Sequence, residues 1–449
     1  MMREAKLGDV VTSMKNGLYK PASEYGDDGV PCLRMYNIEA GSIVWRDIKR
    51  MHVSARELEE YGLHDGDLLV NRVNSRELVG KTACIPPSMG PSVFESKNIR
   101  VRLDPERAFP KFINYQLFAR GRRFFASNAQ QVVGMASISQ GQLADFPIVL
   151  TDLDQQKRIV AEIEKQFSRL DEAVANLKRV KANLKRYKAA VLKSAVEGRL
   201  VETEAELACR EGRSYETGQQ FLQRILETRR SEWKGKGKYK EPAAPDTTDL
   251  PELPEGWAWA TIGQATECLD SMRVPVNKKE RLKRAGDVPY YGANGRVGSI
   301  DDYIFNEPLV LVVEDETFTG REIPFSYKIT GKSWVNNHAH VLRPTGLVTW
   351  DYLNYALSYY PFTALTTGTT GRKKLTQLAL VTAPFGIPPL PEQQRIVAEV
   401  ERRLSLVQEV ESQVVSNLKR ADRLRQSVLG TAFSGGLYSS AHTNLKVAV

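Results

Sequence analysis

The sequence is poor in cysteine, with only four in 449 residues. They are Cys32, Cys84, Cys209 and Cys268. None forms a Cys-X-X-Cys pair, and none has the spacing of a zinc finger. We therefore interpret all four as reduced structural residues, and we expect no bound metal.

Long apolar runs are also missing. No window holds the roughly 18 uncharged apolar residues that a membrane-spanning helix needs. Residues 1–11 carry four charged side chains, so the start of the chain does not resemble a signal peptide. We expect a cytoplasmic protein that makes no membrane contact.

Catalytic motifs are the third absence. Residues 80–82 and 331–333 are Gly-Lys-Thr and Gly-Lys-Ser, as at the end of a phosphate-binding loop. That loop also needs a glycine five residues earlier, where this chain has Ser75 and Ser326. Neither Pro-Pro pair fits the Asn/Asp-Pro-Pro-aromatic motif of an amino-methyltransferase, and no glycine-rich cofactor turn follows a strand. The sequence therefore predicts no catalytic site and no cofactor-binding site.

The chain does have enough apolar side chains for stable cores, together with an excess of positive charge. Hydrophobic residues make up 42% and aromatic residues 8%, a composition that excludes a disordered chain. A length of 449 residues suggests about two to four domains. The net charge of +9 favours a polyanionic partner such as DNA, because each neutralised phosphate releases counterions.

Two of the five histidines, His338 and His340, alternate in sequence and so share one face of a predicted strand. This spacing is compatible with a metal site. No nearby cysteine or acidic cluster completes such a site. We interpret both histidines as structural or DNA-facing.

An internal repeat organises the chain. Residues 155–170, QQKRIVAEIEKQFSRL, return as residues 392–407, EQQRIVAEVERRLSLV, after a shift of 237 positions. The same shift joins Gly134 to Gly371. The offset changes only inside the more variable parts, so the order is globular unit, helix, globular unit, helix. Two copies of this size indicate a pseudo-two-fold molecule and not a solenoid.

Both helical repeats have the pattern of a coiled-coil seam, with alternating steps of four and three residues. The apolar seam residues are Ile163, Phe167, Leu170, Val174, Leu177, Leu184, Val191, Val400, Leu404, Val407, Val414, Leu418 and Val428. Each helix is expected to run for roughly 34 residues, or about 50 Å, and the economical partner of each is the other. If they pair antiparallel about their centres, Lys181 comes near Glu411, and we hypothesise that these two residues set the register.

The predicted fold class is α+β, with two mixed α/β domains separated by two long helices that form an antiparallel coiled coil. The predicted segments are a first domain (1–152), a central helix (153–200), a helical segment with a basic, proline-rich linker (201–252), a second domain (253–389), a C-terminal helix (390–437) and a tail (438–449). The linker composition predicts a mobile tether.

Polar loops at the ends of predicted strands supply candidates for DNA contact. Asn pairs bidentately with adenine edges and Arg or Lys with guanine, whereas a basic loop suits phosphate. The candidates are Asn71, Arg72, Asn74, Arg76, Asn294, Arg296, Asn336, Asn337, His338, Arg372, Lys373 and Lys374. Ordinary turn chemistry remains the alternative explanation for each loop.

Several phrases resemble those of a known family, the specificity subunits of type I restriction enzymes. They are residues 65–74 (DGDLLVNRVN), 253–257 (LPEGW), 290–295 (YYGANG), 334–340 (WVNNHAH) and 388–397 (PPLPEQQRIV). Two departures stand out. The first domain lacks the Leu-Pro-Glu-Gly-Trp phrase, and it has Ser137 where the second domain has Lys374.

The resemblance implies two target-recognition domains, each reading one half of a split, asymmetric site in double-stranded DNA. It implies that the helices form a spacer between them. It also implies docking of two methyltransferase subunits, which bring S-adenosylmethionine and flip an adenine out of the duplex. ATP- and magnesium-dependent restriction subunits would translocate and cut the DNA, so this chain itself would be a non-catalytic subunit.

Two other functions compete with this one. The first is a single-chain restriction–methylation enzyme or its detached recognition half, and the missing catalytic motifs count against the single-chain form. The second is a coiled-coil adaptor without a DNA role, which a salt-dependent shift assay with random duplexes would distinguish.

Overall fold

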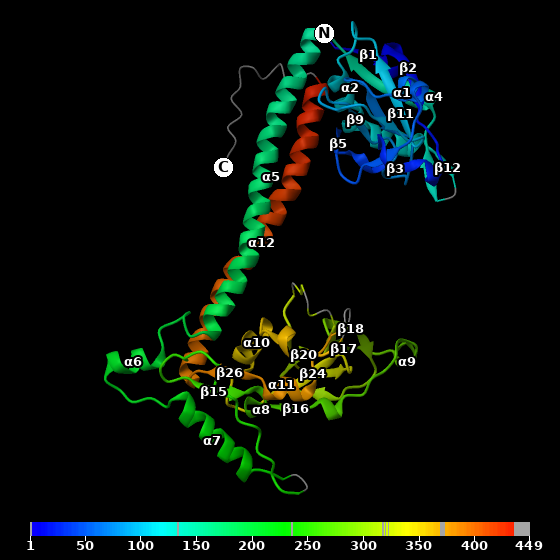
Figure 1. Cartoon of the computed structure of the whole chain (residues 1–449). Coiled ribbons are helices and arrows are strands. Elements are labelled where there is room, and N and C mark those ends of the chain that lie inside the picture. Colours follow the sequence, from blue (N-terminus) through cyan, green and yellow to red (C-terminus); the bar gives the residue numbers. More distant parts are fainter. Residues whose placement is uncertain are drawn as a thin grey trace. The chain divides into compact units, whose positions relative to one another are not determined.

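A computed structural model gives the fold of the chain (Figure 1). It describes residues 2–132, 134–234, 237–316, 318, 320–321, 323–368 and 373–434. The chain divides into two compact units. Unit 1 comprises residues 1–178 and 415–449, and unit 2 comprises residues 179–414. No helix in the described part of the chain has the length and apolar character needed to span a bilayer.

Each unit contains a four-stranded antiparallel sheet, and the two sheets have the same strand order. In unit 1 the order is β2 (Val11–Asn16), β11 (Asn98–Leu103), β7 (Leu68–Asn71) and β9 (Thr82–Cys84). In unit 2 it is β16 (Thr266–Cys268), β24 (Ala339–Pro344), β20 (Leu309–Val313) and β22 (Ser326–Ile329). The central strands β7 and β20 are wholly buried, as expected for apolar runs covered on both faces.

The register of these sheets aligns the two units residue by residue. Just after β7 the backbone N–H of Arg72 donates to the carbonyl of Lys97 at 2.8 Å, and just after β20 that of Glu314 donates to His338 at 3.1 Å. In both units the carbonyl of this residue then accepts an N–H from the residue that follows a short hairpin strand, β13 (Met135–Ser137) or β25 (Lys373–Lys374). Arg72 and Glu314 therefore occupy equivalent positions in the fold.

Smaller sheets complete each unit and also correspond. In each unit one strand has a parallel neighbour on one side and an antiparallel neighbour on the other. This strand is β3 in unit 1 and β17 in unit 2. The strands are β3 (Tyr25–Leu33), β6 (Lys49–Met51), β10 (Val93–Phe94), β17 (Val288–Gly292), β18 (Gly295–Ile300), β19 (Phe305–Asn306) and β23 (Lys332–Val335). The remaining strands are β1 (Arg3–Lys6), β4 (Ile38–Glu39), β5 (Ser42–Ile43), β8 (Val73–Asn74), β12 (Gln130–Val132), β14 (Pro147–Leu150), β15 (Ala258–Thr261), β21 (Asp315–Glu316) and β26 (Pro384–Ile387).

Short helices cover the sheets. Buried residues of α10 pack on β20 in one core, and those of α2 pack on β7 in the other. The helices are α1 (Ala55–Tyr61), α2 (Pro110–Gln116), α3 (Arg122–Asn128), α4 (Gln140–Ala144), α6 (Glu204–Glu211), α7 (Gly218–Ser231), α8 (Ile262–Ala265), α9 (Lys278–Lys283), α10 (Trp350–Ser358) and α11 (Gln377–Thr382).

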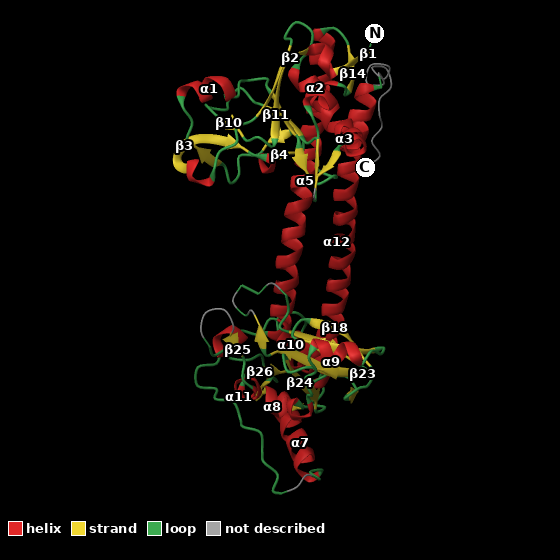
Figure 2. Cartoon of the chain, turned by 90° about the vertical axis from the view of Figure 1, so that its right-hand side faces the viewer, coloured by secondary structure: helices red, strands yellow, loops and turns green. Residues whose placement is uncertain are grey.

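Two long helices belong to both units, α5 (Leu153–Val196) and α12 (Leu390–Phe433). Each has 44 residues, ten more than the seam pattern predicted, because both helices continue into the domain cores at their ends. Within each unit the two helices lie side by side (Figure 2). In unit 1 Arg425 of α12 forms an ion pair with Asp171 of α5. In unit 2 Glu411 of α12 lies 2.7 Å from Lys188 of α5. Residue numbers rise on one helix as they fall on the other, so the pairing is antiparallel.

The predicted seam residues lie on the inner faces of these helices. All thirteen are buried or half-buried, whereas most of the residues between them are exposed. The hypothesised contact between Lys181 and Glu411 is wrong, because Lys181 is exposed and Glu411 pairs with Lys188. Side chains lean toward the N-terminus of their own helix. On antiparallel helices such side chains lean in opposite directions, and the residue that meets Glu411 is Lys188.

A buried glutamine near the N-terminus of each long helix explains why the sequence of residues 155–170 returns at 392–407. The side-chain amide of Gln393 donates to the carbonyls of Leu347 and Pro388 at 3.0 and 3.1 Å, and its oxygen accepts the Thr349 N–H. Gln156, 237 positions earlier, makes the corresponding three bonds in unit 1. Both side chains are fully buried, so the phrase fastens each helix to its own domain.

Candidate nucleic-acid interface

Two of the predicted DNA-contacting residues in unit 1 belong to the interior of the fold. Asn71, at the end of β7, donates to the Lys97 carbonyl at 3.0 Å and to the Asn98 side chain at 3.2 Å. Asn74 donates to the Asn71 side-chain oxygen at 2.8 Å. Their exposed fractions are 0% and 8%. Neither amide is available to a DNA groove, which corrects the prediction for Asn71 and Asn74.

The two arginines of the same loop differ from each other. Arg72 is half-buried, and its Nε is buried without a hydrogen-bond partner among the described residues. Arg76 is exposed and donates from Nε to the Ala126 carbonyl at 2.9 Å. Arg76 also lines a hollow of about 300 Å³ beside the β12–β13 hairpin. Arg76 is therefore the candidate in this loop that faces solvent.

In unit 2 the predicted loops around β17, β20 and β23 come together. Asn294, in the β17–β18 turn, is exposed and accepts a hydrogen bond from Arg321 at 2.8 Å. Asn336 follows β23, and its backbone N–H donates to the carbonyl of Tyr291 on β17 at 3.0 Å. The His338 ring lies 2.6 Å from Asp315, which follows β20. These contacts place three sequence-distant polar loops at one edge of the unit.

Some side chains of these loops are exposed, and others face inward. Arg296 and Asn337 are exposed, and Arg296 donates to the Ser299 hydroxyl at 2.6 Å. Asn336 is half-buried and caps the turn by accepting the His338 N–H at 2.9 Å. Asn294, Arg296, Asn337 and His338 are therefore the candidates of these loops that remain accessible to a partner.

The basic loop of unit 2 faces acidic residues of its own chain. Arg372 lies outside the described residues. Lys373 and Lys374 form β25, whose cross-strand partners in β21 are Glu316 and Asp315. The Lys374 ammonium also lies 3.0 Å from Glu314. The positive charge that the sequence assigned to phosphate is thus partly neutralised within the fold.

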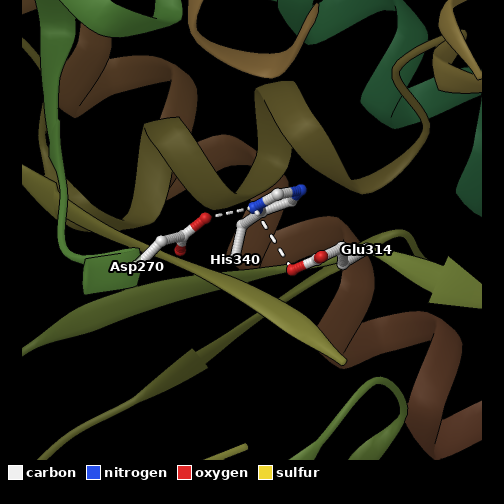
Figure 3. A group of neighbouring side chains, drawn as sticks. All are labelled: Asp270, Glu314 and His340. Carbon is white, nitrogen blue, oxygen red and sulfur yellow. Dashed lines mark hydrogen bonds and ion pairs between the residues drawn. The ribbon is translucent and has the colours of Figure 1, made fainter. Parts of the chain in front are cut away.

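A buried ion cluster lies beneath this loop (Figure 3). His340 contacts Asp270 at 2.5 Å through Nδ1 and donates from Nε2 to the Leu375 carbonyl at 2.9 Å. Since a backbone carbonyl only accepts, Nε2 carries a proton. Burial opposes ionisation of Asp270, but the hydrogen bond with His340 and its charge hold the Asp270 pKa below the usual value. His340 thus links the Asp270 carboxylate to the Leu375 carbonyl through its two ring nitrogens.

Glu314 belongs to the same cluster. Burial opposes its ionisation too, but hydrogen bonds from Arg273 and Lys374 lower the Glu314 pKa overall. Arg273 bridges the two carboxylates, 2.5 Å from Glu314 and 3.2 Å from Asp270. Glu314 thus fastens the start of β21 and the end of β25 to the sheet.

Asp270, Glu314 and His340 place potential metal-binding atoms within 4.8 Å of one another. The expectation that no acidic group stands near the histidines was wrong, because two carboxylates reach His340 from distant segments. Arg273 already neutralises both carboxylates, and a cation at this point would have to displace a guanidinium. The donor set therefore fits an ion-pair cluster better than a metal centre.

Comparison with known proteins agrees with this geometry. Residues 254–413, which include all the candidates of unit 2, match the family described as type I restriction modification DNA specificity domain. Over these residues the chain is similar to the DNA specificity domain of type I restriction–modification systems. A putative type I restriction enzyme specificity subunit of Haemophilus influenzae is 31% identical over 164 residues, which are 36% of this chain and 42% of the relative.

Other members of the family match different lengths. The EcoKI specificity subunit of Escherichia coli is 27% identical over 203 residues, 44% of this chain and 43% of the relative. The EcoBI specificity subunit of Escherichia coli is 23% identical over 446 residues, 96% of this chain and 85% of the relative. The matched region thus spans less than half the length of the Haemophilus and EcoKI relatives.

Two solved structures share the fold over nearly the whole chain. One is described as the structural basis of complex assembly and conformational transition of the type I R-M system, with a TM-score of 0.61, 17% identity and coverage of 97% and 98% of the two chains. The other is the HsdS subunit from Thermoanaerobacter tengcongensis, with a TM-score of 0.52, 17% identity and coverage of 97% of each chain. At this identity the likeness concerns the fold alone.

Proposed function

We propose that this chain is the DNA-reading subunit of a type I restriction–modification complex and has no catalytic role itself. Unit 1 and unit 2 each read one half of a bipartite, asymmetric site. The observation that carries the proposal is the duplication of one sheet, in strand order and register, with the same helix pair fastened to each copy.

In this proposal the exposed polar side chains of the candidate loops contact the bases. Asn294 and Asn337 offer amides to adenine, and Arg296 and Arg76 offer guanidinium groups to guanine. Lys373 is the residue of β25 that is left for phosphate, because Lys374 is engaged by Glu314. The loops in question follow strands of well-packed sheets, and precise readout requires such a support.

The helices α5 and α12 act as the spacer between the two readers. Each helix of 44 residues is about 66 Å long. Half-sites one helical turn of DNA apart are separated by about 34–36 Å and face the same side of the duplex. A packed helix pair is long enough to span that distance, even when its ends are embedded in the domains. The bases between the half-sites then need no contact, so their identity is free.

Partner subunits supply the chemistry in this proposal. Two modification subunits bring S-adenosylmethionine and methylate an adenine that has left the base stack. Restriction subunits use ATP and magnesium to move and cut unmodified DNA. The names of the relatives support this division of labour, since each is described as the specificity subunit of a restriction enzyme.

Methylation mapping in a host that lacks its own adenine methylation tests the function. We expect co-expression of this chain with its modification subunits to give one methylated motif with two half-sites and a constant gap. Replacing residues 253–389 by the second domain of another family member should change one half-site only. An unchanged motif after that exchange, or methylation without this chain, would contradict the proposal.

A further inference from the structure

A short basic helix on unit 2 lies outside every loop considered so far. Helix α9 (Lys278–Lys283) stands between β16 and β17, and none of its residues is buried. The segment 277–284, NKKERLKR, holds five basic residues and one acidic residue. Even Leu282 is 73% exposed, so the helix contributes nothing to the core.

Two arginines fix this helix to the small sheet of unit 2. The Arg281 guanidinium lies 4.5 Å from the ring centre of Tyr290, and that of Arg284 lies 4.7 Å from the ring centre of Trp334. Trp334 also donates from its indole N–H to the Val274 carbonyl at 2.7 Å. Cation–π contacts of this kind stabilise by about 0.5–1 kcal/mol each at exposed sites. The helix is therefore held in place, although none of its residues is buried.

Three lysines of this helix remain unneutralised. Within the described residues Lys278, Lys279 and Lys283 have no hydrogen-bond or ion-pair partner, and all three are exposed. Two other lysines of unit 2 are engaged by acidic residues, since Lys328 pairs with Asp351 and Lys374 with Glu314. The three free ammonium groups thus lie on a helical segment whose arginines contact aromatic rings of the small sheet.

The helix adjoins one of the proposed base-contacting loops. A side chain placed at Gly298 on β18 would meet the Arg281 Nε at 3.2 Å, so strand and helix are in close contact there. Arg296 of the same strand donates from its Nε to the Gly298 carbonyl at 3.1 Å. The cationic surface therefore continues from Arg296 through Arg281 to the lysines of α9.

We propose that Lys278, Lys279 and Lys283 of α9 bind the phosphate backbone of the DNA duplex beside the half-site that unit 2 reads. This inference rests on the proposed function and deepens it. Lysine is a compact point charge that suits phosphate without reading sequence, and a duplex offers one charge per about 1.7 Å of axis. The contacts position unit 2 and are the same for every base sequence.

The test is salt titration of the binding of the full-length chain to duplexes of random sequence. In the test variant Lys278, Lys279 and Lys283 are all changed to alanine. The slope of log Kobs against log salt should become shallower by about 0.9 for each phosphate contact that is lost. Circular dichroism should show an unchanged fold, since none of the three side chains packs in a core.

A matched control removes three other exposed positive charges from unit 2. Arg210, Arg224 and Arg230 each pair with a glutamate of their own segment. The triple change to alanine alters the net charge by the same amount and should leave the slope unchanged. An equal effect in both variants would overturn the inference, because net charge alone would then explain it.

The other possible results bear on the inference and on the proposed function separately. An unchanged slope in the α9 variant, with or without loss of modification-subunit binding, overturns the phosphate contact and leaves the proposed function standing. Loss of modification-subunit binding would then mark α9 as a protein-docking surface. No binding of any duplex by the unsubstituted chain, alone or with modification subunits, would overturn both the inference and the function on which it rests.

Discussion

Glu314 occupies the backbone position in unit 2 that Arg72 occupies in unit 1, so equivalent points of the two sheets carry opposite charges. The difference has local consequences. Glu314 is 6% exposed and holds Arg273 and Lys374, whereas the Arg72 Nε has no partner among the described residues. One scaffold thus supports two differently charged hairpins, as the proposed reading of two different half-sites requires.

The first prediction concerns this pair. Changing Glu314 to Gln should destabilise unit 2 by about 3 kcal/mol, because Arg273 loses a buried counter-charge. Changing Arg72 to Gln is the matched control and should alter stability by about 1 kcal/mol or less. Tryptophan fluorescence during urea unfolding reports mainly on unit 2, which holds five of the six tryptophans. Equal destabilisation by both changes would contradict the role given to Glu314.

The second prediction concerns acid. The Asp270 pKa is lower in the folded chain than its usual 3.8, so the ionised carboxylate stabilises the fold at higher pH. That stabilisation is fully present above the unfolded value and is lost as pH falls through the folded value. The difference in unfolding free energy between the unsubstituted chain and an Asp270→Asn variant should therefore shrink below pH 3.8. A difference that stays constant down to pH 2 would contradict the stabilising role given to the ionised Asp270 carboxylate.

The third prediction concerns the helix pair. Lys188 and Glu411 are each about a third exposed, so their ion pair should contribute less than about 1 kcal/mol. A double-mutant cycle with Lys188→Glu and Glu411→Lys should show favourable coupling when both are exchanged. The same cycle with Lys181 in place of Lys188 should show none. Coupling to Lys181 instead would mean that the helices pair in another register.

The fourth prediction separates stability from recognition in the polar loops. Changing Asn71 to Ala should destabilise unit 1 by about 1–3 kcal/mol, because buried partners lose their hydrogen bonds. The methylated motif should keep its sequence in the protein that remains folded. Changing the exposed Asn337 to Ala should do the reverse, with little loss of stability and a relaxed half-site. A changed motif in the Asn71 variant would contradict the structural role assigned to it.

The sequence predicted the large features because they repeat or have a period. The constant shift of 237 positions identified the two copies, and the four–three pattern identified the helix faces that are buried. The length of roughly 34 residues taken from the seam was too short, since residues such as Leu429 and Phe433 pack into a domain core and not along the seam.

The site was predicted only in part, for physical reasons. Asn71 and Asn74 have the composition of an exposed loop, but strand pairing turns both amides inward. Asp270, Glu314 and His340 come from three separate segments, so no spacing in the sequence connects them. The lysines of α9 were not among the residues predicted from the sequence. Their significance depends on which carboxylates lie nearby, and only the fold determines that.

The central claim is that the helix pair fixes the distance between two readers. Deleting seven residues at matching levels from the middle of α5 and of α12 keeps the seam in phase and shortens each helix by about 10 Å. At about 3.4 Å per base pair, the gap in the methylated motif should contract by about three base pairs, with both half-sites unchanged. Methylation at the original gap by the shortened protein would contradict the account.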